Sequence, residues 1–361
     1  CNKKKNLWIW GANLLTAIVY SEDYRLHDTG NHVENEKRVQ VIMETIQQNN
    51  LVDSEDIYKP GMATLEDLLR VHPANYVEYI QKFCEKGGGS LDFDTAASPR
   101  SYEIAKLSAG GAIKAAELVL NGYESAYSIG RPPGHHATRD RAMGFCIFNN
   151  LAITLEYLRE INNIKKFLIF DFDVHYGNGT ADIFYEDPDV LYISIHQDPR
   201  TIFPGKGFIE EIGNEKGEGT NINIPIPSRS NSHDYKYVLE NILEPVVDKF
   251  SADFYLVDVG FDAHKDDPLS SINLDDDFYE WIAVKMMDLA PSLTLILEGG
   301  YDLNALSRSN TKLIHGLENY KVIKDQYERS DQNLQDRSKV HPETKKLYQD
   351  LREMFSPYFN I

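Results

Sequence analysis

The chain lacks the features that mark disulfide-stabilised and membrane-spanning proteins. Its 361 residues include only three cysteines, Cys1, Cys84 and Cys146, which form no CxxC pair and are too few for a disulfide framework. No apolar run approaches the ~20 residues that a transmembrane helix needs. No internal repeat or low-complexity linker divides the sequence. With an ordinary hydrophobic content of 42%, the chain is expected to be globular, and a large parallel α/β sheet can hold this length in one domain.

Basic residues are also in short supply. The chain has 37 lysines and arginines against 56 aspartates and glutamates, which gives a formal net charge of −19. Because phosphate binding needs clustered Lys and Arg, this balance argues against a nucleic-acid partner. An acidic surface suits a cationic substrate, although solubility alone would also explain the charge.

The first residue is Cys1 rather than methionine. A cysteine followed by a short polar stretch resembles a mature bacterial lipoprotein, whose signal peptide is removed ahead of a lipid-carrying cysteine. The alternative is that the sequence begins at a fragment boundary. The first case predicts a membrane-anchored envelope protein and the second a cytoplasmic one, and the upstream sequence would distinguish them.

Apolar runs of strand character alternate with amphipathic helical segments along the chain. Predicted strands cover residues 16–20, 126–130, 166–170, 190–196, 253–260 and 293–297. Predicted helices cover residues 36–48, 72–86, 101–120, 148–161, 232–250 and 277–289. Residues 21–35 and 91–99 are expected to be loops. This alternation predicts a single-domain, three-layer α/β/α fold with a mostly parallel sheet and right-handed crossovers.

Ionisable side chains directly follow four of these strands. Asp173 and His175 come where the strand at residues 166–170 ends, and their spacing of two points both to one face of an extended segment. The other strand-end residues are His135, His136, Asp262 and Tyr301. In parallel sheets the binding crevice lies beyond the carboxyl ends of the strands. The pattern therefore predicts a metal or acid–base site at that edge.

Four segments at these strand ends resemble the zinc-dependent histone deacetylase family, in family order and spacing. They are RPPGHHA (131–137), DFDVHYGNGT (171–180), GFDAHKDDPL (260–269) and EGGYD (298–302). That family includes acetylpolyamine amidohydrolases and acetoin-utilisation proteins. The residues of these segments are most similar to those of the class II branch. The resemblance implies the arginase/deacetylase fold. The match runs from about residue 17 to about 320, which predicts a catalytic domain at 17–320 after an extension at residues 1–16. Residues 321–361 are highly charged and mostly helical in pattern, and they are expected to form a tail packed on or extending that domain.

The resemblance implies a metal site with one Zn²⁺ per chain. Its ligands would be Asp173, His175 and Asp262, a set that leaves an open position as catalytic sites do. Fe²⁺ fits the same ligands. A monovalent cation site, suited to K⁺, is also implied, and its ligands would be Asp171 with backbone carbonyls of Asp173, His175, Ser194 and Ile195.

The resemblance also implies a role for each of the remaining site residues. His135 and His136 match the tandem active-site histidines, with Asp171 orienting the first. Asn178 stands where some members have a second Asp facing the other histidine, and class II relatives commonly have Asn there. Tyr301 matches the tyrosine whose hydroxyl faces the substrate carbonyl. Residues implied to contact substrate or product are Phe145 and Phe203 on the tunnel walls, Asp94 at the rim, Gly144 and Gly300 beside them, and Arg38 in an acetate exit channel.

Each of these residues also has a purely structural interpretation. The histidines could be loop residues satisfied by backbone groups, Phe145 and Phe203 core aromatics, and Tyr301 a packed turn residue. Cys146 is expected to be a small buried hydrophobe. His264 and Asp266 match no ligand and are interpreted as loop polar groups.

The implied activity is zinc-dependent hydrolysis of acetylated or related acylated lysine side chains or amines, with release of acetate. Acetylpolyamine hydrolysis as the main activity, or a non-catalytic acetyl-lysine-binding module, are the alternatives. A binuclear arginase-type ureohydrolase would need more His and Asp ligands than DFDVH provides.

Overall fold

The computed structural model describes residues 15–330 and 337–361. Cys1, and with it the hypothesis of a lipidated N-terminus, lies outside the described residues. Within them, no helix combines the length and the apolar character needed to cross a bilayer.

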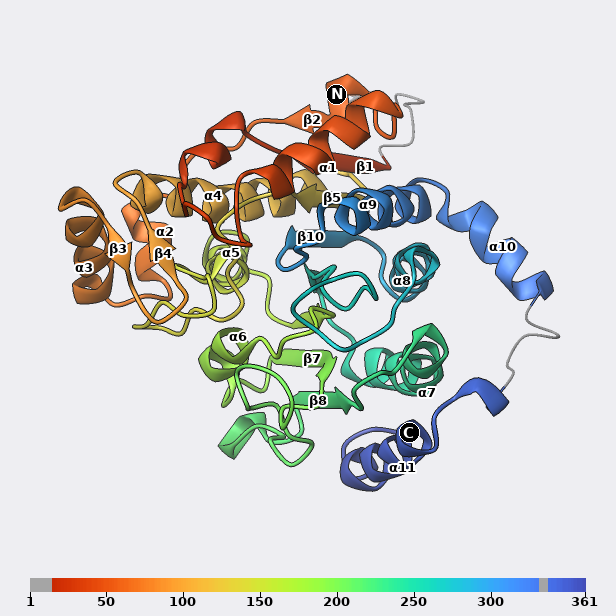
Figure 1. Ribbon diagram of the computed structural model, residues 1–361. Coiled ribbons are helices and arrows are strands. Elements are labelled where there is room, and N and C mark those ends of the chain that lie inside the picture. The colour runs from red at the N-terminus through yellow and green to blue at the C-terminus, as the bar shows by residue number, and fades with distance from the viewer. Residues whose placement is uncertain (1–14, 331–336) are drawn as a thin grey trace, which may run out of the picture.

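An eight-stranded sheet forms the centre of the molecule, in the order β2-β1-β5-β10-β9-β6-β7-β8, and all its pairings are parallel (Figure 1). The strands are β1 (Thr16–Val19), β2 (Ile57–Tyr58), β5 (Ser125–Ser128), β6 (Phe167–Asp171), β7 (Val190–Gln197), β8 (Asn221–Ile226), β9 (Phe254–Val259) and β10 (Leu293–Leu297). Most are buried throughout, because helices cover both faces and a parallel sheet then needs near-continuous apolar strands. The prediction of a three-layer α/β/α domain is confirmed.

Helices cover both faces of the sheet (Figure 1). On one face lie α1 (Lys37–Gln48), α7 (Ser232–Phe250), α8 (Asp276–Leu289) and α9 (Leu303–Glu318). On the other lie α4 (Ser101–Leu120), α5 (Asn150–Ile161) and α6 (Asn178–Phe184), with α2 (Leu65–Leu69) and α3 (Ala74–Glu85) outside them. Short 3-10 helices occupy Glu22–Leu26, Ser54–Asp56, Glu215–Gly217 and Arg337–Lys339.

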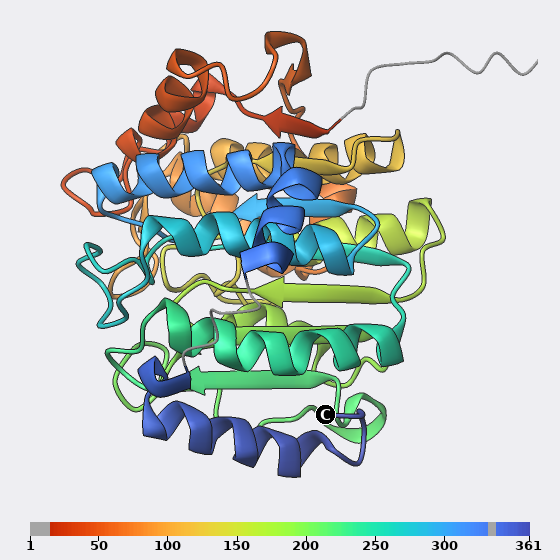
Figure 2. The same ribbon diagram turned by 90° about the vertical axis from the view of Figure 1, so that its right-hand side faces the viewer.

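Side-chain caps fix where the helices near the site begin. Asp275 caps α8 by accepting the N–H of Phe278, and Asp302 caps α9 by accepting that of Ala305. Each of these helices follows a loop that carries site residues. The caps therefore help to hold those loops at the carboxyl edge of the sheet, toward which the arrowheads in Figure 2 all point.

The structure adds several elements to those predicted from the sequence. Helix α9 and strand β8 were not predicted, and neither was the small antiparallel pair β3 (Gly89–Ser90) and β4 (Ala96–Ala97). Strand β8 contains Pro225, which argues against a central strand but is tolerated at a sheet edge, where one side of the strand has no partner.

Two further helices follow the last strand of the sheet and its helix α9. Helix α10 (Tyr320–Ser330) packs against α8 and α9, while α11 (Pro342–Phe355) lies along α7 and the edge strand β8 (Figure 2). Leu351, Phe355 and Phe359 are buried there. The helical character expected after residue 320 is therefore found in the described part of that stretch, whereas the domain boundaries near residues 17 and 320 stay a prediction.

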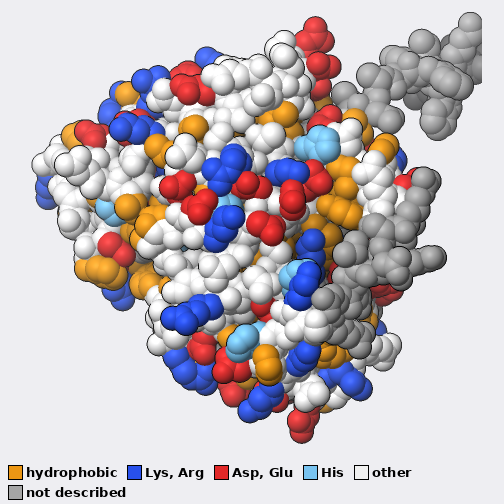
Figure 3. Space-filling model, turned by 45° about the vertical axis from the view of Figure 1, so that its right-hand side comes forward, with side chains coloured by type: hydrophobic (Ala, Val, Ile, Leu, Met, Phe, Trp, Pro, Cys, Tyr) orange, Lys and Arg blue, Asp and Glu red, His pale blue; other side chains and the backbone are white. Residues whose placement is uncertain are grey.

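Ion pairs link α8 to α9 across the surface. Arg308 on α9 pairs with Asp266 at 3.0 Å and with Asp276 at 2.9 Å, and Lys312 pairs with Asp277 at 2.7 Å. Figure 3 shows basic side chains lying among acidic ones on the face that it presents. The net negative charge is thus not gathered into one acidic patch on that face.

Candidate active site

A cavity of about 340 Å³ opens at the carboxyl edge of the sheet. It lies where the loops after β5, β6, β7, β9 and β10 converge, as the strand-end pattern predicted. The residues that line it are Asp94, Pro133, His135, His136, Gly144, Phe145, His175, Thr201, Ile202, Phe203, Leu269, Gly299 and Tyr301. Eight of these, from the rim acid Asp94 to Tyr301, were singled out from the sequence.

Three buried side chains at the floor of this cavity form a candidate metal site. The ligand atoms of Asp173, His175 and Asp262 all lie within 4.8 Å of one another. The Nδ1 atom of His175 is 3.0 Å from Asp173 Oδ1 and 3.1 Å from Asp262 Oδ2. A Cβ atom at Gly299 would overlap carboxylate oxygens of both aspartates, so only glycine leaves this space open.

The chemistry of this donor set fits a divalent cation. Two carboxylates buried side by side repel each other, and a cation between them removes that cost. His175 shows how strongly this point attracts positive charge. Burial alone would lower its pKa, but the adjoining carboxylates of Asp173 and Asp262 outweigh burial and raise it to about 10. Two carboxylates and one imidazole are a ligand set that leaves room for water and substrate on a catalytic metal.

His135 is paired with a carboxylate beside this site. Its Nδ1 lies 3.1 Å from Asp171 Oδ2, which also accepts a 2.7 Å hydrogen bond from the Tyr192 hydroxyl. The backbone N–H of His135 donates to Glu298 Oε2. Burial opposes protonation here, but the charges of Asp171, Asp173 and Glu298 prevail and raise the pKa of His135 well above its usual value.

His136 has a neutral hydrogen-bond partner, unlike His135. Its Nδ1 is 2.8 Å from the side-chain oxygen of Asn178, and its ring stacks at a tilt 4.1 Å from that of His135. Burial, together with positive charge on His135 and His175, lowers the pKa of His136 well below its usual value. Since an amide oxygen only accepts, Nδ1 must carry the proton and Nε2 keeps its lone pair.

Tyr301 also lines the cavity. Burial raises the pKa of its hydroxyl well above 10, so the group keeps its proton. The guanidinium of Arg38 lies 4.8 Å from the centre of the Tyr301 ring, and Arg38 Nε donates to the carbonyl of Gly300. The edge of the Phe145 ring meets Tyr301 at 5.6 Å between ring centres.

The mouth of the cavity is aromatic on two sides. Phe203 packs 5.0 Å from the His136 ring, and Phe145 adopts a positive φ of 69° directly after Gly144. Gly144 lies against the His136 ring with no room for a Cβ. Asp94 stands at the rim, where burial and then its neighbour Asp92 raise its pKa to about 6.

The other predicted residues lie behind the cavity wall or outside it. Asp171 and Asn178 contact His135 and His136, and Asp173 and Asp262 contact His175, without lining the cavity themselves. Gly299 rather than Gly300 lines the cavity. Ser194 and Asp171 are neighbours on adjacent strands, and the Ser194 hydroxyl is 2.8 Å from His196 Nδ1. The monovalent cation site stays a prediction, as does the exit channel at Arg38.

A sequence model described as the histone deacetylase domain matches residues 32–317. The chain belongs to the histone deacetylase family.

Two relatives and one solved structure illustrate the histone deacetylase relationship. A probable deacetylase from Methanothermobacter thermautotrophicus is 46% identical over 351 residues, covering 96% of this chain and all of the relative. A histone deacetylase-like amidohydrolase from Pseudomonas aeruginosa is 41% identical over 245 residues, covering 66% of this chain and 64% of that protein. The crystal structure of the HDA15 HD domain superposes with a TM-score of 0.86 at 28% identity, covering 96% of each chain.

Membership in the histone deacetylase family supports a deacetylase reaction, carried out by a hydrolase on acetylated substrates. Relatives named deacetylase and amidohydrolase agree with it. The buried Asp and His groups at the cavity floor could hold the metal on which the family generally depends.

Sequence reasoning missed a buried carboxyl group close to His135 and Asp171. Asp258 is fully buried within β9, and neither of its oxygens has a hydrogen-bond partner among the described residues. Burial, and then the charge of Glu298, raises its pKa well above the usual value. With His135 and Asp171 it makes a second set of groups within 4.8 Å of one another. A lone acid inside the apolar run FYLVDV was the available signal.

Proposed function

We propose that this protein is a zinc-dependent deacetylase that hydrolyses the acetyl amide of acetylated lysine side chains and releases acetate. The observation that carries the proposal is a pair of adjoining histidines with opposite pKa shifts, beside three buried metal-binding groups in one cavity. Perturbed groups of this kind gather at catalytic sites. Asp173, His175 and Asp262 would hold the ion, and a bound divalent ion of this type polarises a carbonyl and makes water more acidic.

His136 would be the general base. Its lowered pKa keeps the ring neutral at pH 7, and the Asn178 bond to Nδ1 leaves the Nε2 lone pair free for a proton. Nε2 would take one proton from the attacking water as the new C–O bond forms. An asparagine in this place, rather than a carboxylate, keeps His136 a moderate base.

His135 would be the proton donor. The Asp171 carboxylate on Nδ1 and the raised pKa favour the imidazolium form. As the C–N bond breaks, His135 would deliver a proton to the leaving amine nitrogen, so that the proton taken at His136 is balanced by the one given at His135. This division gives each histidine one role, set by its partner.

The Tyr301 hydroxyl would donate a hydrogen bond to the oxygen of the tetrahedral intermediate. Its high pKa keeps it a donor across the physiological range. Such preorganised donors are worth most where water is excluded. Phe145 and Phe203 would flank the aliphatic stem of the substrate, because a neutral acyl-lysine passes between aromatic faces more readily than a charged lysine does.

A substrate panel tests this proposal. Purified protein would be offered acetyl-lysine peptides, acetylated polyamines and peptides with longer acyl groups, and released acetate or acid would be measured. Turnover of the peptides supports the proposal, and faster turnover of acetylpolyamines would move the substrate class to small amines. If no substrate is hydrolysed and hydroxamates do not bind, the assignment of a catalytic function fails.

A further inference from the structure

One buried carboxylate near Tyr301 belongs neither to the metal-binding groups nor to the histidine pairs. Asp267 lies in the loop between β9 and α8 and is only 7% exposed. Its Oδ2 accepts the backbone N–H of Tyr301 at 2.6 Å and that of Asp302 at 3.3 Å. Its Oδ1 accepts the N–H of Leu269 at 3.0 Å. Both carboxylate oxygens therefore bind backbone amides.

Two of the three residues whose amides Asp267 binds line the cavity. Tyr301 and Leu269 both line it, and they come from loops that follow two different strands. Asp302 in turn caps α9 through its own side chain. A single carboxylate thus joins the loop after β9, the loop after β10 and the first turn of a 16-residue helix.

The peptide unit between Gly300 and Tyr301 is held from both ends. Arg38 Nε donates to its carbonyl oxygen at 2.7 Å, and Asp267 Oδ2 accepts from its N–H. The Arg38 cation at the carbonyl and the Asp267 carboxyl oxygen at the amide both align with the peptide dipole, and a hydrogen bond to a charged group such as the Arg38 guanidinium is stronger than a neutral one. Gly300 has a φ of +117°, so the backbone before Tyr301 has little restraint of its own.

We propose that Asp267 is a positioning residue for catalysis, which fixes the Gly300–Tyr301 peptide so that the Tyr301 hydroxyl meets the substrate carbonyl. This inference rests on the proposed function. Asp267 touches neither substrate nor metal in it, and acts only through the backbone of Tyr301. Replacement of Asp267 should therefore weaken stabilisation of the transition state and lower kcat. This loss should disappear when the tyrosine hydroxyl is already absent.

The test compares Asp267→Ala in two backgrounds, the full chain and the same chain with Tyr301→Phe. In the full chain we expect kcat to fall about 10²-fold, the scale of a misplaced catalytic group, with little change in KM or metal content. In the Tyr301→Phe background we expect little further loss, because the hydroxyl that Asp267 positions is already gone. Asp267→Asn keeps one acceptor oxygen and should retain more activity than Asp267→Ala.

Asp266→Ala is the matched control. Asp266 lies in the same loop, but its side chain is about half exposed and pairs with Arg308 at 3.0 Å, outside the cavity. We expect this variant to keep its kcat. Equal losses for the two aspartates, or the same fold-loss from Asp267→Ala in both backgrounds, would overturn the inference, as would an unchanged kcat in both Asp267 variants. Full activity in Tyr301→Phe alone would also overturn the inference, because the hydroxyl that Asp267 positions would then have no role, whereas absence of deacetylase activity in the unaltered chain would refute the proposed function.

Discussion

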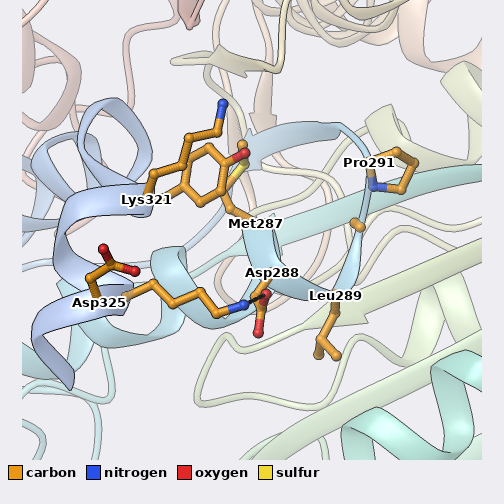
Figure 4. A pocket seen from close by; sticks show the side chains of 9 residues that line it. Met287, Asp288, Leu289, Pro291, Lys321 and Asp325 are labelled. Atoms are coloured by element: carbon orange, nitrogen blue, oxygen red, sulfur yellow. Dashed lines mark hydrogen bonds and ion pairs between the residues drawn. The ribbon is translucent and has the colours of Figure 1, made fainter. Parts of the chain in front are cut away.

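Two hollows of the molecule differ in character, and the larger of the two is not the candidate active site. A groove of about 530 Å³ lies between the end of α8 and the start of α10, against about 340 Å³ for the cavity at the carboxyl edge (Figure 4). Because β10 begins directly after this end of α8, the groove lies at the amino edge of the sheet. The residues that line it are Met287, Asp288, Leu289, Ala290, Pro291, Tyr320, Lys321, Lys324 and Asp325.

The two hollows differ in how their charges are held. In the groove, Lys324 pairs with Asp288 and Lys321 with Glu124, all four side chains partly or largely exposed and screened by water. In the cavity, His135, His136 and His175 are buried and their pKa values are displaced in different directions. Buried charge, rather than volume, distinguishes the site that can do chemistry.

The largest effect is expected from a metal ligand. Asp262→Ala should abolish both metal binding and deacetylase activity, because the remaining ligands cannot hold the ion. Metal analysis of the unaltered protein should find close to one Zn²⁺ per chain. Full activity without metal would contradict the proposal, and a second bound ion would point to the group formed by His135, Asp171 and Asp258.

Removal of the Tyr301 hydroxyl should give the next largest effect. Tyr301→Phe keeps the ring that packs on Phe145 and lies by Arg38. Loss of one oxyanion donor typically lowers kcat ~10²- to 10³-fold. Steady-state kinetics with an acetyl-lysine peptide would measure it, with metal content as the control. An unchanged kcat would mean that the hydroxyl has no part in the reaction.

A histidine outside the cavity should affect stability rather than activity. His72 is buried, its Nδ1 contacts the carbonyl of Arg139, and its Nε2 accepts the N–H of Asn149. Burial lowers its pKa to about 4, below the unfolded value of 6.5, so the unfolded state binds the extra proton. This contribution to stability is complete above pH 6.5 and is lost as pH falls toward 4.

The size of that loss follows from the shift. One pKa unit corresponds to 1.36 kcal/mol, so His72 alone would lower the free energy of unfolding by as much as about 3 kcal/mol at pH 4. Denaturant unfolding at several pH values would measure it. His72→Gln should show a flatter pH dependence over this window, and an equally steep one would assign the acid sensitivity to other groups.

The smallest effect is expected in the groove. Lys324→Ala breaks a partly exposed ion pair with Asp288. We expect the free energy of unfolding to change by less than about 0.5 kcal/mol and kcat and KM to stay the same. Thermal unfolding and the peptide assay would check both. A clear loss of activity would break the contrast between the two hollows.

The sequence was informative where local pattern and structure coincide. The apolar run at residues 293–297 and the amphipathic segment at 232–250 match β10 and α7 residue for residue. The side chains that follow the strands do meet at one cavity, since parallel strands bring their carboxyl ends to the same edge. Strand β8 was not predicted because asparagine and proline residues such as Pro225 are not typical of a central strand.

The supporting residues of the site were harder to predict for a different reason. Asp267 accepts the backbone N–H of Tyr301, and Gly299 lies against the carboxylates of Asp173 and Asp262. These contacts join residues that are distant in sequence, and they depend on how the backbone turns at each loop. Their local sequence would suit any polar loop. A pattern can indicate which side chains carry chemistry, whereas the residues that hold them in place emerge only from tertiary contacts.

Helix α11 lies against the edge strand β8, where a strand of another molecule could otherwise pair. Strand β8 is the last strand of its sheet, and a bare outer strand offers backbone groups that a strand from another molecule can pair with. Helix α11 packs on β8, with Leu351 and Phe355 buried beneath it. Because α11 contacts this edge strand, we expect it to limit pairing of β8 with a strand from another molecule, an effect separate from the chemistry at the carboxyl edge.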